Sequence, residues 1–176
     1  MNFLKKPKNI MKTIKILGVL LALIVSTLAV NAQTKTYNNY GVSMTYPSYL
    51  VLDEEDYSDG ELNLEFSDVD EISGMIVLVS SNEEILTVLE LIGLETVFNM
   101  LQDEMMSEFD GAELGDIEKT DSSVIMPFTM SEDGVVVNGE MALGVQGNKL
   151  ILTVILGHGS EKFSALKQAV KTLKVS

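Results

Sequence analysis

The sequence predicts an α+β fold, a mainly antiparallel β-sheet of about six or seven strands with helices on both faces, that is, an α/β/α sandwich. The run Lys149–Leu156 (KLILTVIL) is apolar at nearly every position, which is typical of a short strand covered on both faces. The stretch before it, Val135–Gln146, alternates apolar and polar residues, which indicates a strand with one buried face. A tight Gly147-Asn148 turn joins the two. A strand covered on both faces needs helices as its cover, and two segments have helical spacing.

The first 32 residues are predicted to be a signal peptide outside the fold. Lysines precede an apolar run, Ile16–Val30, and small residues occupy the −3 and −1 positions before Gln33. This pattern predicts export to the periplasm or secretion, with cleavage between Ala32 and Gln33. The alternative is an uncleaved membrane anchor, but the apolar core of about 15 residues is shorter than the roughly 20 that a membrane span needs. Either Met1 or Met11 can be the start of translation.

Composition limits the function of the remaining single domain, residues 33–176. The leader holds five of the 12 lysines and none of the 26 acidic residues, so the rest of the chain has a net charge of −19 and no arginine. This charge disfavours nucleic-acid binding and binding to an anionic membrane, so no stable membrane insertion is expected after cleavage. The absence of cysteine excludes disulfides, thiolate catalysis and cysteine metal sites.

The first half of this domain is predicted to be mostly strands. Short aromatic segments flank an Asn39-Tyr40-Gly41 turn, and Glu61–Ser67 alternates strictly between apolar and polar residues. Two acidic segments, Asp53–Gly60 and Asp68–Gly74, are predicted to be loops. The predicted strands are Thr34–Asn38, Val42–Tyr46, Glu61–Ser67 and Met75–Ser80.

Helical patterns follow. Ser81 and Glu84 have the spacing of a capping box, and an apolar stripe continues to Phe109 with a break at Gly93. A second amphipathic helix begins at Ser160, a predicted N-cap. Between the helices the sequence predicts a turn at Gly111–Gly115, strands at Ile117–Thr120 and Val124–Ser131, and a turn at Glu132-Asp133-Gly134; Asn138-Gly139 is either a bulge or a turn.

The order of these segments resembles a known family. The start YGVSMTYP (residues 40–47), the three-strand meander with an acidic-Gly turn and a last helix ending in LKVS (173–176) resemble the PsbP-like and DcrB-like group of small exported α/β/α sandwiches over residues 36–176. The resemblance implies an antiparallel sheet with helices on both faces and no enzymatic activity. Some photosynthetic members help to retain metal ions, but no ligand pattern carries over. The large aromatic residue that often follows the proline, usually Trp, is represented here by Tyr49.

Few residues suggest catalysis or metal binding. His158, the only histidine, and Ser160 lie where the central strand meets a helix, which is the one place for a hydrolytic pair. Carboxylates in the acidic segments can ligate calcium, although the spacing does not fit an EF-hand. The candidate calcium ligands are Asp53, Glu54, Asp56, Asp59, Asp68 and Asp70. No cofactor motif occurs, so no cofactor is expected.

The sequence therefore predicts an exported, non-catalytic binding or assembly module of the cell envelope. The sequence does not identify the partner, which is a protein or another envelope component, and it does not give the oligomeric state. The alternatives are a small hydrolase that uses His158 and Ser160, and a weak calcium-binding acidic protein.

Overall fold

The computed structural model describes residues 33–69, 72–106, 109, 111–132 and 134–176. Lys35–Ser176 form one compact unit. The predicted signal peptide (1–32) and the residues Asp70 and Asp133 lie outside the described residues, so the leader and its cleavage site stay predictions. None of the described helices has both the length and the apolar character that a bilayer crossing requires.

The described part of the chain is a mixed α+β structure. Its strands are β1 Thr34–Asn39, β2 Val42–Pro47, β3 Val51–Ser58, β4 Glu61–Ser67, β5 Gly74–Ser80, β6 Glu113–Leu114, β7 Glu118–Lys119, β8 Ser123–Glu132, β9 Val135–Gln146, β10 Lys149–His158 and β11 Lys174–Val175. Its helices are α2 Glu83–Ile92, α3 Leu94–Met106 and α4 Gly159–Lys171.

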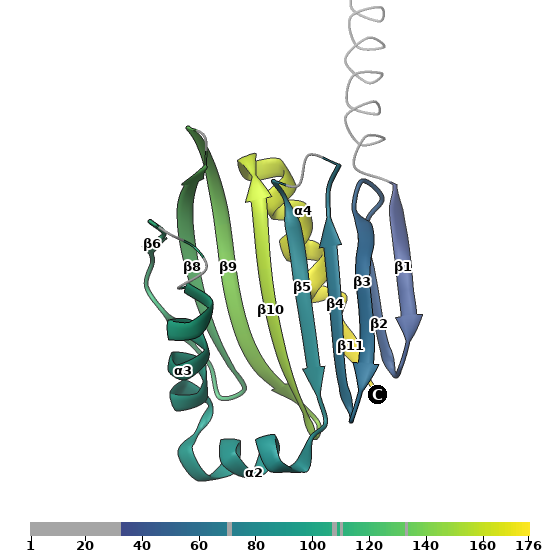
Figure 1. Ribbon diagram of the computed structural model, residues 1–176, viewed down its shortest axis with the longest axis vertical. Helices are drawn as coiled ribbons and strands as arrows, with labels where there is room; N and C mark the ends of the chain where they lie inside the picture. Colours follow the sequence, from purple (N-terminus) through teal and green to yellow (C-terminus); the bar gives the residue numbers. More distant parts are fainter. Residues whose placement is uncertain (1–32, 70–71, 107–108, 110, 133) are drawn as a thin grey trace, which may run out of the picture. The chain divides into compact units, whose positions relative to one another are not determined.

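The strands form two sheets (Figure 1). The larger has eight strands in the order β3-β4-β5-β10-β9-β8-β6, with β7 also paired to β8, and the smaller has the order β1-β2-β11. The described ladders of the large sheet are antiparallel, and β10 lies in its middle, as predicted for KLILTVIL. The strand count exceeds the predicted six or seven because β3 was predicted to be a loop and the two-residue strand β6 to be part of a turn.

Side chains of β10 alternate between two apolar clusters. Leu150, Leu152 and Val154 pack in one cluster with Phe98 of α3. Ile155, on the other parity, packs in a second cluster with Leu166 of α4. This arrangement explains why the strand is apolar at nearly every position, since side chains on both of its faces are buried.

The acidic segment Asp53–Gly60 is not the predicted loop. Most of it is the strand β3, which pairs with β4 through a register shift between Leu52 and Glu54. Acidic residues have low strand propensity in a half-buried setting. β3 is the last strand of the sheet, however, and its acidic side chains are exposed. Charged side chains are a common way to protect such an edge from pairing with other chains.

Both predicted N-caps are one or two residues from the observed ones. Asn82, rather than Ser81, caps α2, and its side chain accepts a hydrogen bond from the Glu84 backbone N–H. Ser81 Oγ instead donates to the Gly60 carbonyl, 2.9 Å away. α4 begins at Gly159, so Ser160 lies inside its first turn, and His158 is the N-cap without a side-chain cap bond. The predicted break at Gly93 is confirmed, since it is the C-cap of α2.

Several predicted turns and strands also differ. The β8–β9 register passes through Asn138-Gly139 without a shift, so this pair is neither a bulge nor a turn. A Cβ on Gly139 would lie 2.3 Å from the Phe128 ring, so glycine is needed for the close approach of that ring. Gly111–Gly115 contains the short strand β6, the strand predicted at Ile117–Thr120 is reduced to β7, and Phe109 lies beyond the end of α3.

Candidate binding surface

The corner between β10 and α4 holds the two predicted hydrolytic residues. His158 and Ser160 are both exposed, and no hydrogen bond within the described residues links their side chains. The His158 backbone N–H donates to Ser73 Oγ over 3.0 Å, so the corner is fixed to the start of β5. A triad needs serine, histidine and a carboxylate in sequence. The structure does not bring such a set together here.

Beside this corner lies a half-buried ion pair. Asp68, 4% exposed, accepts a hydrogen bond from Lys162 Nζ of α4 and two from the backbone N–H groups of Ile72 and Ser73. Burial acts to raise the pKa of Asp68, but the Lys162 bond and the backbone donors outweigh it and hold the pKa below its ordinary value. Both oxygens of this calcium candidate are therefore already engaged in fastening the β4–β5 connection to α4.

Tyr49, two residues after Pro47, flanks the same ion pair. Its ring centroid lies 5.7 Å from Lys162 Nζ, within the range of a cation–π contact. Burial, with smaller contributions from the nearby charges of Asp68 and Glu161, raises the pKa of Tyr49. The ion pair and the ring together form a structural joint between the sheet and α4.

The remaining calcium candidates do not form a ligand set. Asp53, Glu54 and Asp56 lie along the strand β3, where neighbouring side chains point to opposite faces, and Asp59 lies in the β3–β4 turn with a φ of 51°. Asp70 lies outside the described residues. Across the part of the chain that the structure describes, no three His, Cys, Asp or Glu residues are grouped closely enough to hold a metal ion.

One carboxylate of β3 has a structural role that the sequence did not indicate. Glu55 Oε1 accepts hydrogen bonds from the Tyr37 hydroxyl (2.8 Å) and from Asn39 Nδ2 (3.0 Å). Burial, followed by the bond to Glu55, raises the pKa of Tyr37. Next to these bonds, the rings of Tyr40 and Tyr57 stack with centroids 4.5 Å apart. These contacts fasten β1 and its turn to β3, and they engage one of the two carboxylate oxygens of Glu55.

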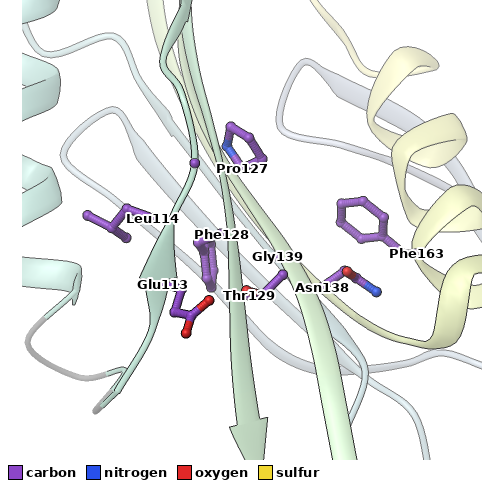
Figure 2. A pocket seen from close by; sticks show the side chains of 9 residues that line it. Glu113, Leu114, Pro127, Phe128, Thr129, Asn138, Gly139 and Phe163 are labelled. Atoms are coloured by element: carbon purple, nitrogen blue, oxygen red, sulfur yellow. The ribbon is translucent and has the colours of Figure 1, made fainter.

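A hollow of about 250 Å³ lies near the opposite edge of the large sheet, where β6, β8 and β9 are neighbours (Figure 2). Phe163 of α4 stands on one side and Glu113 of β6 on the other. Register places Thr129 opposite both Glu113 and Asn138, so a carboxylate, a hydroxyl and an amide lie in a row across three strands. Sites for small organic molecules usually have about 300–1,000 Å³. The hollow falls below this range.

The most unusual surface is at the β3 end of the sheet. Glu61, Asn63 and Glu65 alternate with buried Leu62, Leu64 and Phe66 on β4, so they point to the opposite face. Register then places Glu54 and Asp56 of β3 and Leu78 of β5 on that same face. We define the acidic edge surface as Glu54, Asp56, Glu61, Glu65 and Leu78, together with the outer edge of β3.

No described helix covers this surface. Leu78, on the innermost strand of this surface, is 36% exposed, whereas the equivalent face of β8, β9 and β10 is packed in the cluster that contains Phe98 of α3. Acidic charge continues well beyond the surface, since residues 36–118 contain 21 Asp and Glu and no Lys, Arg or His. All seven lysines that follow the predicted leader lie at Lys35 or from Lys119 onward.

Two neighbouring carboxylates in this surface work against the fold. Glu54 and Glu65 are register partners in the β3–β4 ladder, and like charges directly opposite each other destabilise a sheet. Asn63 Nδ2 donates to Glu65 Oε1 over 3.1 Å, but no described lysine lies in either strand. Departures from the locally most stable choice are expected at functional sites.

The fold class defined by this sheet order is PsbP-like. Cyanobacterial PsbP (CyanoP) from Synechocystis, solved in solution, matches with a TM-score of 0.51 and 16% identity, over 82% of this chain and 94% of that chain. This confirms the predicted resemblance at the level of the fold alone. No family model and no curated protein matches the sequence.

Two further solved structures match less well. A crystal structure from Bacteroides thetaiotaomicron has a TM-score of 0.45 and 16% identity, over 82% of this chain and 49% of that one. A Pseudomonas aeruginosa protein of unknown function has a TM-score of 0.45 and 9% identity, over 82% of this chain and 99% of that one. At these scores neither match bears on function.

Proposed function

We propose that the protein is an exported, non-catalytic binding or assembly module of the cell envelope, and that the acidic edge surface is where it binds. The observation that carries this proposal is a part of the sheet that no described helix covers, where the four carboxylates of the acidic edge surface lie to one side of the partly exposed Leu78 and none of them is in an ion pair among the described residues. Charge that the fold does not need is expected at functional sites, where a sequence departs from the locally most stable choice. The same negative charge makes nucleic acid an unfavourable partner.

Export is the second part of the proposal. It is supported by the signal-peptide pattern of residues 1–32 and by the absence of cysteine, which leaves the fold independent of the redox state of its compartment. The helices on both faces, as in an α/β/α sandwich, are the third part. They are supported by the alternation of β10 side chains between the cluster of α3 and the cluster of α4.

Fractionation and affinity capture test this function. The cellular fraction that holds the protein is identified, the N-terminal residue of the purified chain is determined, and the chain from Gln33 onward is used to capture partners from envelope extract. We expect an envelope or secreted fraction, Gln33 as the first residue, and a defined partner. A cytoplasmic protein that keeps Met1 or Met11, or a chain that captures nothing, would contradict the proposal.

A further inference from the structure

We infer that β3 is a docking edge for a basic protein segment in extended conformation, which pairs with β3 as an additional strand and places cationic side chains on the acidic edge surface. This inference rests on the proposed binding function and deepens it by naming the partner's chemistry and mode of binding. Three observations on the described residues lead to it: a free strand edge, a segregated charge and an unfavourable carboxylate pair.

The first observation is the edge itself. β3 is eight residues long and pairs only with β4, and no other backbone hydrogen bond among the described residues involves Val51–Ser58. The contacts that β1 and its turn make with β3 are side-chain contacts to Glu55 and Tyr57, which lie on the other face from Glu54 and Asp56. They leave the outer N–H and C=O groups of β3 without backbone partners among the described residues, and such groups can pair with a further strand. Addition of a strand to such an edge is a common mode of peptide recognition, in which main-chain bonds supply affinity and side chains supply specificity.

The second observation is the negative charge next to the position of an added strand. An added strand next to β3 would place its side chains beside Glu54 and Asp56 on the uncovered face, with Glu61 and Glu65 one strand further in. Leu78 on β5 adds an apolar contact on the same face, against which the aliphatic stem of a lysine or arginine can pack. A partner with basic residues at alternate positions would match this face.

The same charge argues against a second copy as the occupant. If β3 paired with β3 of another molecule, acidic side chains would lie opposite acidic side chains, which is destabilising. The net charge of −19 after removal of the predicted leader would add long-range repulsion between copies. The acidity of β3 thus opposes self-pairing and favours a basic partner.

Protection of the β3 edge against aggregation explains the acidic residues of β3 but not the acidic residue Glu65 of β4. Acidic residues on β3 would be enough to protect the edge. Glu65 lies on β4, inside the sheet and directly opposite Glu54, where its charge adds repulsion without covering the edge. A bound cationic side chain between these two carboxylates would convert the repulsive pair into an attractive set.

Three synthetic peptides and three forms of the protein test the inference. The first peptide has the eight-residue length of β3 and alternates lysine with threonine and valine. The second has the same sequence with N-methyl groups on every internal backbone nitrogen, so that it keeps the charge but neither of its edges can donate ladder hydrogen bonds to β3. The third carries glutamate in place of lysine. Binding is measured by calorimetry to the natural chain, the double variant Glu54→Gln with Asp56→Asn, and the control Glu83→Gln with Glu84→Gln.

We expect the lysine peptide to bind the natural chain and the Glu83/Glu84 control equally, and to bind the Glu54/Asp56 variant about five- to tenfold more weakly. The N-methylated peptide and the glutamate peptide should show no binding. Equal binding of the N-methylated peptide would overturn strand pairing, and equal loss in both double variants would overturn the location.

The outcome also separates this inference from the proposed function. If the lysine peptide does not bind, but the protein still captures an envelope partner and capture survives Glu54→Gln with Asp56→Asn, the docking edge is wrong and the binding module stands. If the protein captures no partner and is not exported, the proposed function fails, whatever the peptides show.

Discussion

The two halves of the large sheet differ in how they use one face. On β8, β9 and β10 that face is packed with apolar side chains against Phe98 of α3. On β3, β4 and β5 it carries Glu54, Glu65 and Leu78, and no described helix lies over it. Phe98 is 0% exposed and Leu78 is 36% exposed. Both halves bury apolar side chains on the opposite face of the sheet, where Leu64 of β4 and Val77 of β5 are fully buried. The contrast therefore concerns one face only: it adds to the core over β8–β10, and over β3–β5 it carries charge that the fold does not need.

The largest expected effect is at Phe98, the residue of α3 that covers one half of the sheet, and it is compared with Leu78 of the other half. Phe98→Ala should lower the free energy of unfolding by about 3–5 kcal/mol, because it leaves a cavity in a packed cluster. Leu78→Ala should cost less than about 1 kcal/mol, because the side chain is partly in water already. Urea unfolding of both variants measures the difference. Similar losses at the two positions would contradict the contrast between the halves.

The next effect concerns Asp68, a carboxylate of the uncovered half that is buried and paired. Asp68→Ala should cost about 2–3 kcal/mol, since it leaves Lys162 and two backbone N–H groups without their acceptor. Asp56→Ala, an exposed acidic residue on β3, is the control and should change stability by less than about 0.5 kcal/mol. Thermal and urea unfolding provide the measurement, and equal effects of the two changes would refute the role of the ion pair.

The pH dependence of stability follows from the same residue. The pKa of Asp68 is lower in the folded than in the unfolded chain, so its contribution to stability is fully present above about pH 4 and is lost as pH falls through the lowered folded pKa. The difference in unfolding free energy between the natural chain and Asp68→Asn should therefore be constant near neutral pH and shrink in acid. A difference that grows on acidification would have the wrong sign for this account.

A smaller loss is expected where the small sheet meets β3. Tyr37→Phe removes the hydroxyl that donates to Glu55 and should cost about 1 kcal/mol. The variant keeps the ring, so the change reports on the hydrogen bond. Tyr57→Phe, whose ring stacks on Tyr40 without a described hydroxyl bond, is a suitable comparison and should be nearly neutral. Equal losses would mean that the Tyr37–Glu55 bond does not hold β1 to β3.

The smallest expected effect is a gain in stability rather than a loss. Glu54→Gln should raise the free energy of unfolding by about 0.2–0.5 kcal/mol, because it removes the repulsion between Glu54 and Glu65. The gain should fall as salt is added, since exposed charges are screened. Unfolding curves at low and high ionic strength measure it. A loss of stability would show that the carboxylate pair is not a cost to the fold.

The sequence predicted the parts of the fold that depend on local patterns. The apolar run of β10, the alternation of β4 and the break at Gly93 each have a period or a residue type that determines the structure nearby. β3 was missed because its acidic residues contradict strand propensity, and only its place at the sheet edge makes that composition acceptable. That place depends on pairing across the whole chain.

The candidate surface was beyond sequence patterns for the same reason. Asp68 and Lys162 are 94 residues apart, and no local spacing joins them. Glu54 and Glu65 become neighbours only through the β3–β4 register. The segregation of acidic residues into 36–118 can be counted directly in the sequence, but it does not single out this half, because 11 of the 21 lie at 83–118, a stretch that includes α2 and α3.

Amide hydrogen exchange tests the central claim most directly. The exchange rates of Val51–Ser58 are measured without and with the eight-residue lysine peptide at saturation. We expect the β3 amides to become protected on addition of the peptide, while the amides of α2 keep their rates. Unchanged exchange along β3 in the presence of bound peptide would contradict the claim that this edge is where the partner pairs.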